Sequence, residues 1–200
     1  MARPREHDEE TRAALHAAAE RIVAESGPDA LSVRAVADEA DTTTRAVYTL
    51  FGSKDGLVAT LAQHAFGLLV ARAGAVRETR DPAADLVRTG VNGFRPFVLE
   101  HPSLYRIAFQ RVVPGLREVP ELTAARGRAL KLLQSRVHRV KDAGGIPRKS
   151  VAEASVEFNA MCEGLANAEL RGTTLPILPA GHEERAWTAA LRSVVRGWAA

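Results

Sequence analysis

The sequence predicts an all-α protein, and three observations lead to that class. Apolar residues recur at helical spacing along almost the whole chain of 200 residues. No stretch alternates apolar and polar residues in the way that a half-buried strand does. Glycine and proline gather at intervals that end one helix and precede the next. We therefore expect about nine helices and no sheet.

Three of these helices are expected within the first fifty residues or so. The first covers residues 9–26 and ends before Gly27-Pro28. Ser32 is the expected N-cap of a second, short helix that ends by Ala40. One of the threonines 42–44 caps a third helix, which Phe51-Gly52 closes. The apolar stripe of the first helix comprises Leu15, Ala18, Ile22 and Val23.

The later helices follow from capping and breaking signals. Ser53 caps a fourth helix that runs toward Arg80, and Asp81-Pro82 begins the next element. His101-Pro102 breaks that element, and a loop is expected around Val113–Gly115. The remaining helices are expected at 120–144, at 150–172 with a capping box from Ser150 to Glu153, and at 182–199 after a loop over 172–181.

Composition narrows the function classes. A single cysteine excludes an internal disulfide, and the six histidines form no helical metal-ligand pair, so we expect neither a metal nor another cofactor. The chain carries no G-x-S-x-G, P-loop or His-x-x-x-His motif, which argues against an enzyme. No uncharged apolar run approaches the roughly 18 residues of a membrane span, and the start lacks a signal-peptide core. We expect a cytoplasmic protein without a membrane partner.

Residues 31–57 carry the most informative pattern: a short helix, a tight turn and a second short helix with a polar outer face. This pattern is typical of a helix-turn-helix. Burial of Ala46, Val47 and Leu50 would leave the opposite face free to enter a DNA major groove. The outer residues of that face are Thr44, Arg45 and Thr49.

The chemistry of the exposed residues fits DNA. Thr43 and Thr44 can donate to phosphates or meet a thymine methyl group, and Arg45 can pair with a guanine edge. Lys54 and the helix N-terminus at Ser53 make a phosphate site. We therefore expect a DNA-binding domain over 1–56. Its net charge is −4, however, while the remainder of the chain carries +7, so bulk charge does not locate the DNA-binding face.

Residues 11–66 resemble the amino-terminal domain of the TetR family of bacterial transcriptional regulators. The likeness lies in Ser32–Ala37, Ala40, Thr43, Ala46-Val47-Tyr48, Phe51, Ser53-Lys54 and Leu57. It implies that Tyr48 and Lys54 touch the DNA backbone and that Arg34 approaches bases or phosphates, although Tyr48 could also pack against the first helix. The expected DNA-binding residues are Ser32, Arg34, Thr43, Thr44, Arg45, Tyr48, Thr49 and Lys54.

The sequence departs from the family pattern at three places. Asp41 stands where the turn usually has glycine, Arg45 where glycine is common, and Leu50 where histidine is common. Asp41 can adopt the left-handed turn at modest cost, so the fold is expected to survive. These departures leave the preferred DNA sequence open.

The second half of the chain is similar to a subgroup of that family whose regulatory domain carries a tryptophan followed by histidine-glycine. The corresponding runs here are 159–165 and 169–172, with Asn159 and Glu163 in place of the tryptophan and histidine. The resemblance implies a helical ligand-binding and dimerisation domain over 57–200.

A ligand pocket is expected in that domain because large apolar residues accompany scattered polar ones. The alternative is that each aromatic side chain belongs to the plain core. His64 is expected on the inner face of the fourth helix, where it could sense a ligand or be an ordinary buried, hydrogen-bonded histidine. The candidate ligand-binding residues are His64, Phe94, Phe97, Tyr105, Phe109, Phe158, Asn159, Met161 and Cys162.

Seven-residue repeats in the last two helices predict a packing seam. Such a seam can belong to the core of one chain or meet the same seam of a second copy. Two tryptophans on the terminal helix favour the second interpretation. The expected interface residues are Val151, Ala154, Leu165, Ala168, Trp187, Leu191, Val194 and Trp198.

The leading hypothesis is a homodimeric regulator, most often a repressor by family resemblance. It would bind palindromic double-stranded operator DNA and be released by a small-molecule effector. The alternative is a helical small-molecule-binding or scaffolding protein that has lost operator binding. The acidic balance of residues 1–56 and the departures at Asp41 and Arg45 favour that alternative.

Overall fold

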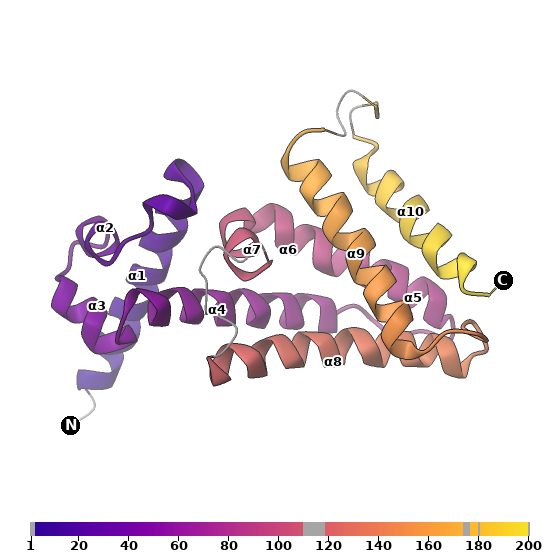
Figure 1. Cartoon of the computed structure of the whole chain (residues 1–200), viewed down its shortest axis with the longest axis horizontal. Helices are drawn as coiled ribbons and strands as arrows, with labels where there is room; N and C mark the ends of the chain where they lie inside the picture. Colours follow the sequence, from indigo (N-terminus) through magenta and orange to yellow (C-terminus); the bar gives the residue numbers. More distant parts are fainter. Residues whose placement is uncertain (1–2, 110–118, 174–176, 180, 200) are drawn as a thin grey trace. The chain divides into compact units, whose positions relative to one another are not determined.

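The structure is a computed structural model that describes residues 3–109, 119–173, 177–179 and 181–199. Every regular element in these ranges is helical, which confirms the all-α class (Figure 1). The expected loop at Val113–Gly115 lies outside the described residues, as does Pro176 of the expected loop 172–181.

The chain forms two compact units. The first comprises Met1–Phe66 and His101–Arg126, and the second comprises Gly67–Glu100 and Gly127–Ala200. This division assigns residues 57–66 and 101–126 to the first unit, whereas the sequence division assigned them to the second domain. Packing alone does not say which residues serve DNA or a ligand, so the functional boundary after residue 56 stays a prediction.

Three helices of the first unit correspond to the three predicted within the first fifty residues or so. They are α1 (Arg3–Ser26), α2 (Val33–Glu39) and α3 (Thr44–Phe51). The hydroxyl oxygen of Ser32 accepts the N–H of Ala35 at 3.1 Å, and that of Thr43 accepts the N–H of Ala46 at 3.2 Å. Thr43 is therefore the cap among the three threonines, because its oxygen pairs an N–H that the helix itself leaves free. Helix α1 begins earlier than predicted.

The turn between α2 and α3 contains Asp41, the residue that stands where the family usually has glycine. Asp41 has φ 49°. Aspartate tolerates this left-handed conformation better than most residues, although glycine would adopt it without cost. The expectation that the turn survives without glycine is confirmed.

Helix α4 (Lys54–Gly74) begins in the first unit and ends in the second. It stops six residues before the predicted end at Arg80. By length and composition it could cross a membrane, a test that core helices of soluble proteins also pass, and half of its most apolar 18-residue window is buried inside the protein. The first unit is completed by α7 (Pro102–Phe109), which packs against α1.

The second unit contains α5 (Pro82–Arg88), a π-helical turn at Thr89–Phe94, α6 (Arg95–Glu100), α9 (Val151–Leu170) and α10 (Glu183–Gly197). Helix α8 (Pro120–Asp142) begins in the first unit and continues into the second. The predicted Asp81 N-cap and the capping box of Ser150 and Glu153 are both present.

The core of the second unit is tight around the π-helical turn. A Cβ atom added at Gly90 would lie 2.4 Å from the Leu191 Cδ1 atom and 3.2 Å from the Phe158 ring. Only glycine allows this approach of backbone to side chains. The side chains of α9 and α10 therefore close directly over the turn.

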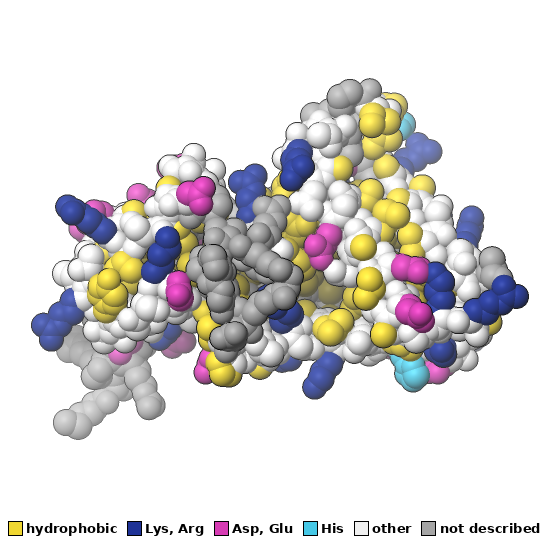
Figure 2. All heavy atoms as spheres, in the orientation of Figure 1, with side chains coloured by type: hydrophobic (Ala, Val, Ile, Leu, Met, Phe, Trp, Pro, Cys, Tyr) yellow, Lys and Arg dark blue, Asp and Glu magenta, His cyan; other side chains and the backbone are white. Residues whose placement is uncertain are grey.

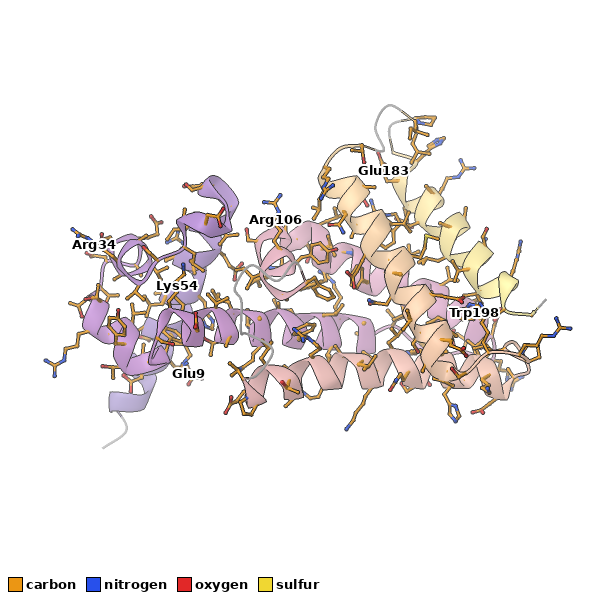
Figure 3. The ribbon with its side chains drawn as sticks, in the orientation of Figure 1. Glu9, Arg34, Lys54, Arg106, Glu183 and Trp198 are labelled. Atoms are coloured by element: carbon orange, nitrogen blue, oxygen red, sulfur yellow. The ribbon has the colours of Figure 1, made fainter. Side chains whose placement is uncertain are left out.

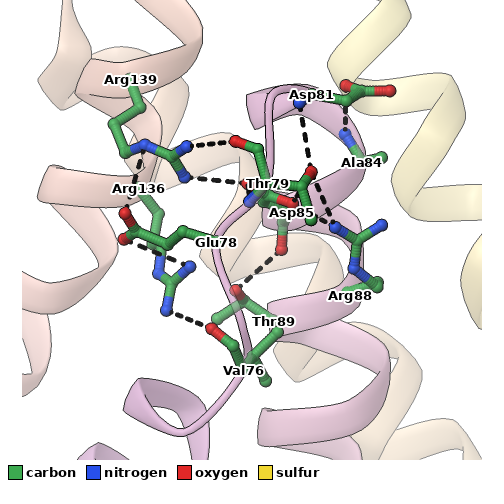
Figure 4. Close-up of polar contacts among 10 residues, drawn as sticks. All are labelled: Val76, Glu78, Thr79, Asp81, Ala84, Asp85, Arg88, Thr89, Arg136 and Arg139. Carbon is green, nitrogen blue, oxygen red and sulfur yellow. Dashed lines mark hydrogen bonds and ion pairs between the residues drawn. The ribbon is translucent and has the colours of Figure 1, made fainter.

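A buried carboxylate fixes the connector that follows α4 (Figure 4). Asp85 is fully buried and accepts the N–H and the hydroxyl of Thr79, both at 2.7 Å. Arg139 of α8 donates to Asp85 at 2.9 Å and to the Thr79 carbonyl at 2.8 Å, and Arg88 also pairs with Asp85. Arg136 donates to the Val76 carbonyl at 2.7 Å.

These bonds change the ionisation of Asp85 and explain the early end of α4. Burial alone would raise the pKa of Asp85, but hydrogen bonds from Thr79 and Arg139, with the positive charge of Arg88, lower that pKa to about 2. Because Thr79 and Val76 are held by side chains of α5 and α8, their backbone groups do not continue the helix.

Candidate nucleic-acid interface

Helix α3 buries one face and exposes the other. Val47 and Phe51 are buried, and Ala46 and Leu50 are half-buried. The opposite face exposes Thr44, Arg45, Tyr48 and Thr49. This is the pattern of burial predicted for the helix that would enter a groove, and an exposed face with hydroxyls and a guanidinium can make hydrogen bonds to DNA.

Tyr48 is one of the exposed large apolar side chains, with 54% of its surface accessible. Partial packing against the protein and a contact with DNA can therefore coexist in this side chain. A half-exposed phenol can lie along a sugar-phosphate backbone and donate its O–H to a phosphate oxygen. The contact itself stays a prediction.

The flanking segments add further exposed polar groups. Arg34 extends from α2 into solvent, and its one ion pair with a residue that the structure describes is a long one with Asp38, at 3.8 Å (Figure 3). Lys54 is exposed at the start of α4, where the Ser53 hydroxyl oxygen accepts the N–H of Gly56 at 3.0 Å. Ser32 and Thr43 are exposed as well, and each hydroxyl that accepts a capping bond still has its O–H to donate.

The cations of this unit differ in their freedom to bind a phosphate. Arg21 is held by Glu39 at 2.7 Å, and Arg12 lies over the Phe51 ring at 5.2 Å. Within the part of the chain that the structure describes, no ion pair involves Arg45 or Lys54. These two side chains are therefore available without breaking an existing pair.

The predicted ligand-binding residues fall in both units. His64, Tyr105 and Phe109 belong to the first unit, and the others belong to the second. His64 is exposed to solvent, yet its ring lies 5.7 Å from that of His16 on α1, on the side of α4 that faces α1. Five are buried, and Phe109, Asn159 and Met161 are half-buried; the buried ones are Phe94, Phe97, Tyr105, Phe158 and Cys162. Their burial agrees with the alternative stated in the sequence analysis, in which such side chains belong to the plain core.

Two polar members of this set, Asn159 and Cys162, have a structural role within α9. The amide of Asn159 donates to the Glu163 carboxylate at 2.5 Å. Burial raises the pKa of the Cys162 thiol, so it stays protonated and unreactive. Among the described residues, no group of three His, Cys, Asp or Glu is placed to hold a metal ion.

The predicted interface residues divide into buried and open ones. Ala154, Trp187, Leu191 and Trp198 are buried within the single chain. The remaining four, Val151, Leu165, Ala168 and Val194, are half-buried. The seven-residue repeat therefore describes, in part, the packing of α9 on α10 inside one protomer.

An open groove lies between α9 and α10, with a volume of about 680 Å³. Hydrophobic side chains are visible on this face in Figure 2. The sequence analysis named four residues of this groove but not its small ones. The small residues recur every four positions along each helix, and that spacing could have revealed them. The groove is lined by Ala160, Met161, Gly164 and Leu165 of α9 and by Ser193, Val194, Gly197 and Trp198, with Lys149 and Glu157.

Two family models match the chain. One describes bacterial regulatory proteins of the tetR family and covers residues 15–61; the other describes the tetracyclin repressor-like C-terminal domain and covers residues 87–194. Comparison with curated protein sequences finds no match.

Solved structures share the fold over nearly the whole chain. A protein of unknown function from a Rhodococcus species is 24% identical with a TM-score of 0.79, covering 95% of this chain and 96% of its own. The TetR family transcriptional regulator PfmR of Thermus thermophilus is 22% identical with a TM-score of 0.69, covering 91% and 97%. The fatty acid degradation regulator FadR of Bacillus halodurans is 17% identical with a TM-score of 0.73, covering 92% and 93%.

The second family model alone spans more than half of the 200 residues, and the first covers the helix-turn-helix whose exposed face is described above. The fold that the chain shares with these solved structures agrees with both matches. The chain therefore belongs to the TetR family of bacterial transcriptional regulators, with an amino-terminal helix-turn-helix DNA-binding domain and a carboxyl-terminal ligand-binding domain.

Proposed function

We propose that the protein is a cytoplasmic repressor that binds a palindromic operator as a homodimer and is released by a small-molecule effector. The observation that carries this proposal is the outer face of α3, which exposes two threonines, Arg45 and Tyr48 over a buried apolar face. A two-fold dimer presents two such helices, so the half-sites should lie about one DNA turn, roughly 34 Å, apart or somewhat more.

Each exposed residue receives a role from its chemistry. Arg45 reads a guanine edge through a bidentate pair, and Thr44 and Thr49 contact phosphates or a thymine methyl group. Lys54 neutralises a phosphate next to the free N–H groups at the start of α4. The DNA backbone on either side of the base contacts is bound by Ser32, Arg34, Thr43 and Tyr48.

The groove between α9 and α10 supports the homodimer. Its lining is mainly apolar, and Ala160, Gly164, Ser193 and Gly197 are small enough for a partner helix to approach closely. We assign the same helices of a second copy as its occupant, because a two-fold axis brings identical faces together and lets the exposed apolar side chains of one protomer fill the groove of the other.

The effector would act through α4, the helix shared by the two units. An effector weakens operator binding only if it prefers the conformation that binds DNA poorly. A coupling of roughly 1–3 kcal/mol would lower operator affinity about 5- to 150-fold. Reciprocity requires operator DNA to weaken effector binding by the same factor.

Replacing Lys54 with alanine should weaken binding to all DNA sequences alike. The change removes one phosphate contact per subunit, so the slope of log K against log salt should become shallower by about 1 for each subunit. Fluorescence anisotropy over a salt series measures both effects. A changed sequence preference with an unchanged salt slope would show that Lys54 does not bind phosphate.

Replacing Arg45 with alanine should have the opposite signature. We expect loss of discrimination at one base pair of each half-site, by about 1–3 kcal/mol, with little change in affinity for unrelated DNA. Competition binding with operators substituted one position at a time tests this. If every position keeps its preference, Arg45 does not read a base.

The alternative, a family member that has lost operator binding, makes a different prediction for gel-shift experiments with DNA flanking its own gene. A regulator gives saturable binding that resists competitor DNA. Absence of any shift at low salt would favour the scaffolding protein, because low salt strengthens every electrostatic contact with DNA.

A further inference from the structure

Asp41 keeps a side chain at a position where the backbone favours glycine. Among the residues that the structure describes, it is the one non-glycine residue with a positive φ, 49°. An L-residue in this left-handed region incurs a conformational cost that glycine avoids. A backbone conformation that is retained in spite of its cost points to a function of the side chain that stands there.

The carboxylate of Asp41 makes no contact within the protein that would explain its retention. Thr43, rather than Asp41, is the N-cap of α3. Within the described part of the chain, the carboxylate takes part in no hydrogen bond or ion pair, although the exposed Arg45 follows four residues later. The Asp41 side chain is itself exposed, so its charge is free to act on a partner.

Asp41 lies at the end of α3 that a helix-turn-helix directs toward the bases (Figure 1). It stands two positions before the cap Thr43, so the two Cα atoms are no more than about 7.6 Å apart. That distance is shorter than the screening length of about 8–10 Å at physiological salt. The charge of Asp41 is therefore only partly screened from DNA bound at the start of α3.

A carboxylate discriminates among the groups that line the major groove because it only accepts hydrogen bonds. Phosphate oxygens, the O6 and N7 atoms of guanine and the O4 atom of thymine are also acceptors and repel it. Adenine presents its amino group beside the N7 acceptor, whereas cytosine presents its N4 amino group without a neighbouring acceptor. Cytosine is therefore the base edge that suits a carboxylate best.

We propose that Asp41 reads a cytosine in each half-site of the operator by accepting a hydrogen bond from the N4 amino group of that base. This inference rests on the proposed function, because it requires α3 to enter the major groove. It gives a role to a departure from the family pattern, since a carboxylate in the turn binds cytosine and disfavours the other bases at that position. Asp41 and Arg45, both near the start of α3, then read a cytosine and a guanine.

The variant Asp41→Asn tests this role, because asparagine has nearly the shape of aspartate and tolerates the left-handed turn. Its amide can pair with the N6 and N7 atoms of adenine, which a carboxylate cannot do. Operators selected by the unaltered protein from randomised duplex DNA should carry a cytosine at one position of each half-site. With Asp41→Asn that position should show adenine or no preference, with about 5- to 150-fold discrimination lost, while the guanine read by Arg45 is kept.

Two further variants separate base reading from a general effect of charge or of the turn. Asp41→Gly adopts the turn without cost and should lose the preference for cytosine without gaining one for adenine. Asp29→Asn is the matched control, because Asp29 is an exposed aspartate of the same unit outside the helix-turn-helix, and it should keep the preference at every position. Thermal unfolding followed by circular dichroism confirms that the variants are folded.

The same selection distinguishes failure of this inference from failure of the proposed function. If the unaltered protein selects a palindrome and Asp41→Asn selects the same one, Asp41 reads no base and only this inference is overturned. Tighter binding of Asp41→Asn to all DNA, with the same base preference, would show a charge that merely repels phosphates and would overturn it as well. If the unaltered protein retains no DNA at low salt, the proposed function fails and this inference fails with it.

Discussion

Replacing Gly164 with glutamate should convert the proposed homodimer to a monomer and reduce operator affinity by about 10²–10⁴-fold. Gly164 lines the groove between α9 and α10, and a Cβ atom added there meets nothing within 4 Å of its own chain. The protomer therefore tolerates the side chain, while a partner helix in the groove would meet a buried charge. A monomer engages one half-site and loses the advantage of linked binding.

Analytical ultracentrifugation and anisotropy with operator DNA measure the two effects. Gly127→Glu is the matched control, because Gly127 also lies in a helix, α8, with nothing within 4 Å of an added Cβ atom. It introduces the same charge and should remain dimeric. A dimeric Gly164→Glu variant with unchanged operator affinity would exclude the groove as the interface.

Replacing Asp85 with asparagine should lower the free energy of unfolding by about 1–3 kcal/mol. The substitution keeps the shape of the side chain but leaves Arg88 and Arg139 without the buried carboxylate that both contact. The asparagine amide carries no charge to offset the two arginines and accepts fewer hydrogen bonds than the carboxylate. Both arginines keep contact with solvent, and Arg139 keeps its ion pair with Glu78, which limits the loss. Urea denaturation followed by circular dichroism measures the loss.

Asp38→Asn provides the comparison, since it removes an exposed pair with Arg34 and should change stability by less than about 1 kcal/mol. The pH dependence gives a second test. Because the pKa of Asp85 falls from 3.8 to about 2 on folding, its contribution is complete above the unfolded value and is lost as pH falls through the folded one. That acid-dependent component should be missing in Asp85→Asn. Equal losses in the two variants would show that Asp85 is not a structural anchor.

Local signals in the sequence predicted the elements that depend on local physics. Ser32, Thr43 and the pair Ser150 and Glu153 form the expected caps, because a cap needs only a side-chain oxygen within three residues of a free N–H. The outward residues of α3 were also predictable, since a short amphipathic helix has one apolar face to bury.

Features that depend on distant residues were not predictable. The end of α4 at Gly74 depends on Arg136 and Arg139, some sixty positions later in the chain. Helical spacing placed His64 on the side of α4 that faces α1, where its ring lies 5.7 Å from that of His16, but spacing does not show that the imidazole also stays exposed to solvent.

The interface prediction shows a related limit. A seven-residue repeat indicates that a helix packs against another, but it does not identify the partner. In the structure, Trp187 and Leu191 face their own protomer, while the adjacent Ser193 and Gly197 line the open groove. The small side chains, rather than the repeat, mark the face that remains available to a second copy.

Selection of operator sequences from randomised duplex DNA tests the central claim most directly. Sequencing of the DNA retained by the purified protein should yield a palindrome whose half-sites are about one helical turn apart or slightly more. The same selection with Arg45→Ala should lose one base pair of each half-site and keep the spacing. Retained DNA without any common sequence, or a single unpaired half-site, would contradict a dimer that reads DNA with α3.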